Sequence, residues 1–161
     1  MSILKDTKFI MDKYHITANK NLGQNFLIDD DTVSGIVDAC RWLLKPAIPV
    51  RHRKSLKDDL IIEIGPGLGT LTKELLDRAG KVICIELDKR MIEILNDRFS
   101  MYDNFKVLND DVLKVNLKEL IEKEKVKTTK IVANLPYYIT TPIIMKLLEE
   151  RLDIETKRSC R

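Results

Sequence analysis

The chain has 161 residues, of which 44% are hydrophobic and 33% are charged, and its formal net charge is +3 at pH 7. This composition is typical of a single soluble globular domain with one sizeable core. The sequence has no apolar run of eighteen residues and no internal repeat, which excludes a membrane-spanning helix and a repeat array. Charges scattered through residues 1–15 also differ from the apolar stretch of a signal peptide, so we expect a cytoplasmic protein with no membrane association.

The cysteines and the basic residues bear on binding. Cys40, Cys84 and Cys160 lie far apart, whereas zinc sites use closely paired cysteines, so we expect free thiols and no metal site. Residues 41–57 carry six basic side chains and no acid, and subtracting these six from the net charge of +3 leaves −3 for the rest. Such a stretch is either a solvated loop or a phosphate-binding surface.

The first predicted helix follows the capping residues 29–31. Its apolar side chains recur at three and four residues, at Val33, Ile36, Val37, Cys40 and Leu44. Pro46 and Pro49 prevent a regular helix beyond it, so residues 45–57 are predicted to form a surface loop.

From residue 60 onward, short β-type runs alternate with stretches of helical period, which is the pattern of a parallel sheet with crossover helices. Strands are predicted at 60–64, 81–86, 105–109 and 130–133. Helices are predicted at 68–79 with Gly80 as the stop, from the cap Asp88 through Phe99, at 117–124, and from Pro142 at the first helical position through Leu148. The predicted fold class is α/β.

Glu63-Ile64-Gly65-Pro66-Gly67-Leu68-Gly69 joins the first strand of this sheet to a helix through a glycine turn, where backbone can approach a ligand closely. Glu86 lies 21 residues after Gly65 at the end of the next strand, where a carboxylate can accept hydrogen bonds from both hydroxyls of a ribose. The alternative is a plain turn with a surface acid. We interpret Gly65, Gly67 and Glu86 as parts of a nucleoside-binding site.

Thr70 distinguishes between nucleoside cofactors. A dinucleotide fingerprint places glycine or alanine at this position, which disfavours an NAD-dependent oxidoreductase. S-adenosylmethionine carries no phosphate and needs only close backbone approach, so it fits better. Asp111, at the end of the third strand, is then placed to accept from the exocyclic amine of the cofactor's adenine, unless it is an ordinary cap or turn aspartate.

Asn134-Leu135-Pro136-Tyr137 follows the fourth strand and is a signature of amino-methyltransferases. The lone pair of an exocyclic adenine nitrogen is delocalised, and the Asn134 oxygen with the backbone carbonyl next to Pro136 can accept both amine hydrogens and free that pair. Tyr137 offers a ring on which an extruded base can stack, an interaction that contributes about 1 to 3 kcal/mol. Tyr138 is expected to be structural. The alternative is a strand ending in a proline turn with an aromatic anchor. No general base is needed, so we expect catalysis by positioning.

Asn21-Leu22-Gly23-Gln24-Asn25-Phe26-Leu27 resembles the N-terminal cofactor motif of the KsgA and Erm ribosomal RNA adenine methyltransferases, and the other motifs follow in family order. The resemblance implies a Rossmann-like S-adenosylmethionine-dependent methyltransferase fold. It also implies that Asn25 and the Leu27 backbone contact the methionine part of the cofactor, that Gly65 lines its pocket, that Glu86 binds its ribose, that Asp111 binds its adenine, and that Asn134 lies between cofactor and substrate.

Residues 139–142, Ile-Thr-Thr-Pro, look more like the KsgA side of the family, which dimethylates two adjacent adenines near the 3′ end of small-subunit ribosomal RNA. The expected function is therefore N6,N6-dimethylation of adenines in small-subunit ribosomal RNA, with that RNA or the pre-ribosomal small subunit as partner of a monomeric enzyme. Erm enzymes, which modify large-subunit ribosomal RNA, are the nearer alternative.

Two segments depart from the family pattern. Residues 41–57 look like a basic insertion, and the tail at 155–161 is polar and basic where a fifth apolar strand is expected. We therefore expect one domain over 1–161 with an N-terminal arm at 1–28, a parallel sheet incomplete after the fourth strand, and no C-terminal helical domain. The strand at 130–133 would then be an exposed edge. A fragment that holds cofactor or RNA without catalysis is the second hypothesis.

Overall fold

A computed structural model describes residues 2–18, 20, 26–42, 59–126 and 128–152 of the chain. The predicted insertion at 41–57 lies almost entirely outside these residues, and so do Asn25 and the tail at 155–161. In order, the described elements are α1 (Ile3–Lys13), α2 (Asp30–Trp42), β1 (Asp59–Ile64), α3 (Thr70–Leu76), β2 (Lys81–Glu86), α4 (Lys89–Arg98), β3 (Phe105–Asn109), α5 (Leu117–Glu124), β4 (Thr128–Ala133) and α6 (Tyr137–Glu149).

The four strands form a parallel sheet in the order β3-β2-β1-β4, so the predicted α/β class with a parallel sheet is confirmed. Ile62 in β1 is in register with Ile83 in β2 and with Ile131 in β4. Because all strands run the same way, the residues that follow Ile64, Glu86, Asn109 and Ala133 meet at one edge of the sheet.

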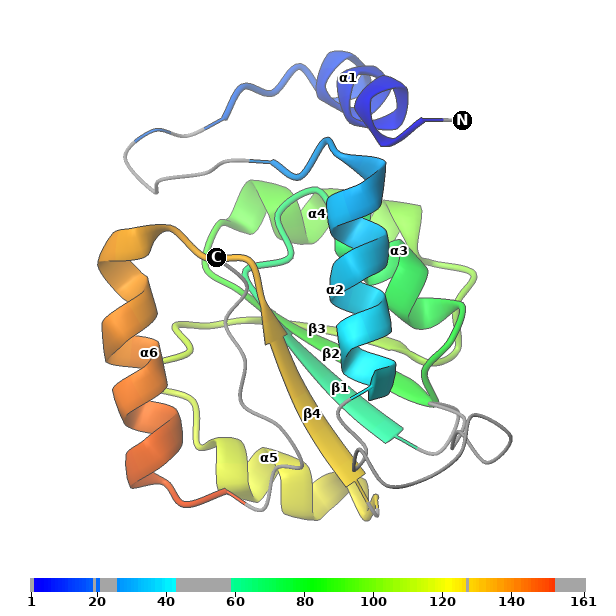
Figure 1. The fold of residues 1–161 in the computed structure, drawn as a ribbon. Helices are drawn as coiled ribbons and strands as arrows, with labels where there is room; N and C mark the ends of the chain where they lie inside the picture. The colour runs from blue at the N-terminus through cyan, green and yellow to red at the C-terminus, as the bar shows by residue number, and fades with distance from the viewer. Residues whose placement is uncertain (1, 19, 21–25, 43–58, 127, 153–161) are drawn as a thin grey trace.

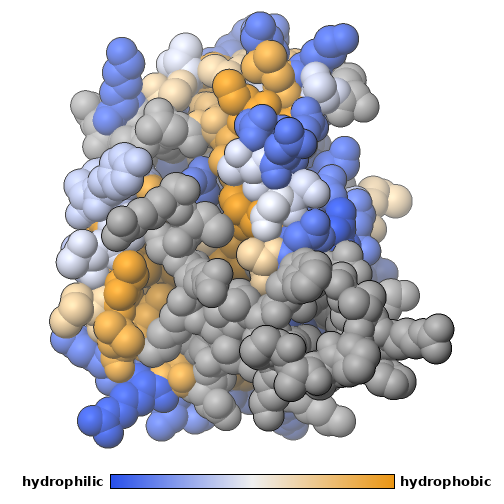
Figure 2. All heavy atoms as spheres, viewed as in Figure 1, coloured by the Kyte–Doolittle hydropathy of each residue, from blue (hydrophilic) through white to orange (hydrophobic). Residues whose placement is uncertain are grey.

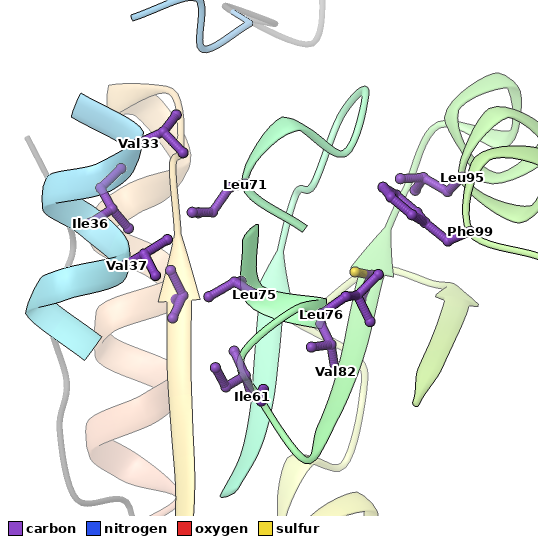
Figure 3. Close-up of a cluster of buried hydrophobic side chains, with 13 residues drawn as sticks. Val33, Ile36, Val37, Ile61, Leu71, Leu75, Leu76, Val82, Leu95 and Phe99 are labelled. Carbon is purple, nitrogen blue, oxygen red and sulfur yellow. The ribbon is translucent and has the colours of Figure 1, made fainter. Parts of the chain in front are cut away.

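Alternate residues of the strands supply two cores. On one face, Ile61 and Val82 pack with side chains of α2, α3 and α4, which Figure 3 shows converging on the sheet. On the other face, Ile62 and Ile83 pack with side chains of α5 and α6. Strands covered on both faces are expected to be largely apolar, as β1 is apart from Asp59 and Glu63 and as β2 is apart from its end residues Lys81 and Glu86.

β4 is the outermost strand of the described sheet, as predicted, yet all six of its residues are buried. The exposed apolar side chains lie instead on α6, where Ile144, Met145 and Leu148 are 40%, 49% and 51% exposed. Figure 2 shows apolar side chains gathered over this helix. The prediction that β4 is exposed is therefore wrong, and the exposed apolar surface lies on α6.

Several predicted boundaries agree with the structure. β2, β3 and α5 begin and end where the sequence predicted, and Asp88 caps α4 by accepting from the Arg90 N–H. The cap before α2 is also confirmed, since the Asp29 carboxylate accepts from the Thr32 N–H at 2.8 Å. β1 and β4 begin one and two residues earlier than predicted, at Asp59 and Thr128.

The start of α3 was predicted wrongly. Gly65, Gly67 and Gly69 have φ angles of +67°, +57° and +80°, so the turn continues to Gly69 and the helix begins only at Thr70. α3 also ends at Leu76, three residues before the predicted end.

The predicted role of Pro142 is also wrong. α6 begins at Tyr137, after Pro136 with φ −58° and ψ 146°, so Pro142 lies inside the helix and not at its first position. The Thr140 hydroxyl supports this early start by donating to the Pro136 carbonyl at 3.0 Å.

α1 was not predicted at all. Its charges are scattered in sequence, but at helical spacing they leave Thr7 and Ile10 together on one buried side. Within the described residues no helix is both long enough and apolar enough to span a membrane.

Candidate functional site

A cavity of about 450 Å³ opens at the carboxyl ends of the strands. It is lined by the glycine turn after β1, the ends of β2 and β3, the segment between β4 and α6, and Phe26 and Leu27 from the N-terminal arm. Ligand sites in open parallel sheets lie at this edge, and the volume is in the range of small-molecule pockets. Among the predicted cofactor residues, Leu27, Gly65, Gly67, Glu86, Asp111 and Asn134 line it.

The glycine turn needs glycine at position 69 for space as well as for its positive φ angle. A Cβ on Gly69 would lie 2.5 Å from a ring carbon of Phe99, whereas one on Gly67 would make an ordinary contact, 3.5 Å from the Phe26 ring. The turn is tied to β2, because the Gly65 N–H donates to the Ile85 carbonyl at 3.0 Å. This hydrogen bond fixes the backbone of the turn where it lines the cavity.

Glu86 ends β2 and is held by backbone donors. Its Oε1 accepts from the N–H groups of Leu87 and Asp88 at 2.8 and 2.9 Å, and its Oε2 accepts from the Gly67 N–H at 3.2 Å. Burial nevertheless raises the pKa of this carboxyl above its usual value, against the effect of the three amide donors. A carboxylate offers about four acceptor sites, so Glu86 can still accept from a ligand hydroxyl.

Glu63 was quoted in the sequence analysis only as the first residue of the glycine-turn motif, and its position in the cavity was not predicted. Its side chain is 2% exposed and lines the cavity beneath the turn. Oε2 accepts from the Thr72 hydroxyl at 2.7 Å and from the Cys84 thiol at 3.6 Å. Burial is the largest influence and raises the pKa of Glu63 to about 7. An acid that interrupts a run of buried aliphatic residues was the signal that could have identified it.

Asp110 and Asp111 line the opposite side of the cavity, directly after β3. The Asp110 N–H donates to the Glu86 carbonyl at 3.1 Å, which joins the two strand ends. Asp111 Oδ1 accepts from the Leu113 N–H at 3.0 Å, the local turn that sequence reasoning gave as its alternative role. The turn and the cavity position are compatible, because a carboxylate keeps free acceptor sites.

The Asn134-Leu135-Pro136-Tyr137 segment connects β4 to α6 along the rim of the cavity. Asn134 is half-buried, whereas Tyr137 is 87% exposed. The Pro136 carbonyl accepts from the Thr140 hydroxyl and from the Ile139 N–H, so it belongs to the start of α6. Tyr138, expected to be structural, is 63% exposed and lines the cavity as well.

The charges around the cavity are of one sign. Four acids line it, at positions 63, 86, 110 and 111, and among the described lining residues there is no lysine, arginine or histidine. Such a lining favours a cationic ligand and disfavours a phosphate or pyrophosphate. In the described part of the chain, no three or more His, Cys, Asp or Glu side chains, including these four acids, are arranged so that they could hold a metal ion together.

Comparison with known proteins agrees with this geometry. The family model for ribosomal RNA adenine dimethylase matches residues 15–158. The chain is 46% identical over 151 residues to the ribosomal RNA small subunit methyltransferase A of Clostridium botulinum (strain Okra / Type B1), covering 94% of this chain and 50% of that protein. It thus spans about half the length of the curated relatives it matches.

Two solved structures are similar at 31% identity. The 23S ribosomal RNA methyltransferase ErmE aligns with a TM-score of 0.59 over 78% of this chain and 43% of that one. A dimethyladenosine transferase from Plasmodium falciparum aligns with a TM-score of 0.57 over 78% of this chain and 38% of that one. Because the family model matches residues 15–158, most of its length, the chain belongs to the ribosomal RNA adenine dimethylase family.

Proposed function

We propose that this chain binds S-adenosylmethionine in the acidic cavity and carries the catalytic half of an enzyme that dimethylates N6 of adenines in small-subunit ribosomal RNA. We propose that this enzyme acts on the pre-ribosomal small subunit in the cytoplasm. The observation that carries it is the lining of the cavity, with four acids and no basic side chain among the described residues. S-adenosylmethionine has a sulfonium and an ammonium group and no phosphate, so this lining suits it better than a dinucleotide.

We propose that the ribose and the adenine of the cofactor bind at the carboxyl ends of two different strands. The Glu86 carboxylate accepts from a ribose hydroxyl, and Asp111 accepts from the adenine amine. Leu27, from the N-terminal arm, and Gly65 lie beside the methionine part, and Asn25, outside the described residues, is proposed to contact it. The cofactor supplies an electrophilic methyl group at its sulfonium, and Asn134 stands between that group and the substrate.

The proposed catalytic step is positioning of the target amine. The Asn134 side-chain oxygen accepts one amine hydrogen. Because the Pro136 carbonyl is already engaged at the start of α6, the Leu135 carbonyl is the acceptor we assign to the second hydrogen. The nitrogen lone pair then points at the methyl group, and the proton leaves to water after transfer.

Tyr137 supports the proposal as a stacking platform. Tyr137 is 87% exposed at the rim of the cavity, and we expect a planar ring of the substrate to cover its side chain when substrate is bound. An extruded adenine stacked on it would gain about 1 to 3 kcal/mol.

Calorimetric titration with S-adenosylmethionine tests the cofactor part. Glu86→Ala should abolish saturable binding, while Glu93→Ala, at an exposed glutamate of α4, is the matched control and should bind as the parent chain does. Equal binding by both variants would contradict the assignment of the cavity.

Methyl transfer tests the substrate part. Immature small subunits should gain dimethyladenosine, detected by mass spectrometry, and large-subunit ribosomal RNA should not; the reverse preference would support the Erm-type alternative. Tyr137→Ala should raise KM for RNA roughly 5-fold to 150-fold, whereas Tyr137→Phe, which keeps the ring, should change it little. Saturable cofactor binding with no transfer to either subunit would support the non-catalytic alternative.

A further inference from the structure

Arg98, the last residue of α4, bridges two segments that are distant in sequence. Its guanidinium donates one hydrogen bond to the Leu68 carbonyl inside the glycine turn and another to the Asp6 carboxylate on α1, where the Nη2 to Oδ2 distance is 2.8 Å. The Arg98 side chain is 12% exposed, so both interactions are largely shielded from water. Charged hydrogen bonds in such surroundings are stronger than those on an open surface.

The same two segments share a small hydrophobic core. Ile10 of α1 packs with Leu68 of the turn and with Met91 of α4, and Phe26 lies against this cluster. Phe26 also faces Gly67 and lines the cavity. α1 is therefore packed on the back of the turn whose front faces the cavity.

A second ion pair holds α1 to α4 without reaching the turn. Lys13 of α1 contacts Asp97 of α4 at 2.9 Å, and both side chains are about half exposed, at 49% and 58%. Asp97 also accepts from the Tyr14 hydroxyl. This pair is a natural control for the Arg98 bridge.

We propose that Arg98 is a positioning residue that couples the docking of α1 to the conformation of the glycine turn, so that docking of α1 and binding of cofactor strengthen each other. While α1 is docked, Asp6 aims the guanidinium at the Leu68 carbonyl and holds the turn. A ligand that needs the turn in this conformation then favours docked α1 by the same factor, because such coupling is reciprocal. The effect on cofactor binding rests on the proposed function, whereas the coupling between α1 and the turn does not.

Hydrogen exchange without any ligand tests the coupling itself. Asp6→Asn changes only α1, yet it should speed amide exchange both in α1 and in residues 64–70 of the turn. Lys13→Gln should speed exchange in α1 with little change in the turn. Equal acceleration of the turn by the two variants, or none by Asp6→Asn, would overturn the assignment to Arg98.

Titration with S-adenosylmethionine tests the consequence for binding. Arg98→Gln should raise Kd about tenfold or more, as expected for a lost charged hydrogen bond. Arg98→Lys should not restore the affinity fully, since a single ammonium lacks the fork that reaches both acceptors. In the parent chain the cofactor should slow exchange in α1, and in Arg98→Gln this protection should vanish.

Parent-like affinity in Arg98→Gln, or undiminished protection of α1, would overturn the proposal. If the parent chain does not bind S-adenosylmethionine at all, the proposed function fails, and the ligand-free exchange experiment still decides whether Arg98 couples α1 to the turn.

Discussion

Replacing Glu63 by glutamine should remove a pH dependence from the stability of this fold. The carboxyl is 2% exposed between β1 and α3, and its two partners are the Thr72 hydroxyl and the Cys84 thiol, with no cationic side chain among the causes of its shifted pKa. Glu86 is close enough to raise the pKa further by repulsion. Glutamine has the same shape, can still accept from Thr72, and does not ionise.

The magnitude follows from the raised pKa. Folding moves the pKa of Glu63 from 4.5 to about 7, so between these values the folded chain binds more protons than the unfolded chain. The free energy of unfolding therefore falls as the pH rises through this window. At about 1.4 kcal/mol per pKa unit, the stability present below pH 4.5 and lost above pH 7 is about 3 kcal/mol.

Urea denaturation followed by circular dichroism at pH 5, 6, 7 and 8 measures the effect. The difference in free energy of unfolding between the parent chain and Glu63→Gln should move in favour of the variant by most of that amount across the series. Glu122→Gln, at an exposed glutamate of α5, is the matched control. A difference between parent and Glu63→Gln that does not change with pH would refute the argument from burial.

Three further substitutions test packing by the same urea assay. Lys130→Met should lower the free energy of unfolding by about 3 to 5 kcal/mol, because it leaves the Asp59 carboxylate, 1% exposed, without its counter-charge; a loss under about 1 kcal/mol would contradict a buried ion pair. Gly69→Ala should destabilise the fold by at least about 1 to 3 kcal/mol, since φ is +80° and the new Cβ would lie 2.5 Å from a ring carbon of Phe99. A parent-like midpoint would mean that the turn can relax. Lys125→Gly should stabilise by about 1 kcal/mol, because this C-cap residue of α5 has φ 51°, where glycine has no steric penalty; a lower midpoint would contradict this.

The positions of the Asn134–Tyr137 segment and of most of the proposed cofactor residues around one cavity could be predicted because their signals are local. The glycine turn and Asn134 each follow a strand and Glu86 ends one, and parallel strands bring their carboxyl ends to one edge. Placing Gly65, Gly67, Glu86, Asp111 and Asn134 on one cavity therefore needed only the order of elements along the chain, whereas Leu27 was placed by the family resemblance. Their proposed roles with cofactor and RNA stay predictions for the experiments above.

The errors have local causes too. Proline is common at the first position of a helix, so Pro142 was predicted to begin the last helix. In the structure Pro136, with extended backbone, is the N-cap residue, and α6 begins directly after it. The helix was predicted to begin at residue 68, yet all three glycines of the turn, Gly69 included, take positive φ, which delays α3 to Thr70. In both cases a backbone conformation, which composition does not specify, decided the boundary.

By itself the sequence determined the α/β class, the bounds of β2, β3 and α5, and six of the residues that line the cavity, because their signals lie in short stretches of the chain. Only the tertiary structure decided that Glu63 is a buried acid with a raised pKa, that Lys130 is buried against Asp59, and that Arg98 joins α1 to the glycine turn. These features join residues up to 92 positions apart. Their strength depends on exclusion of water, which exists only once the helices have packed on the sheet.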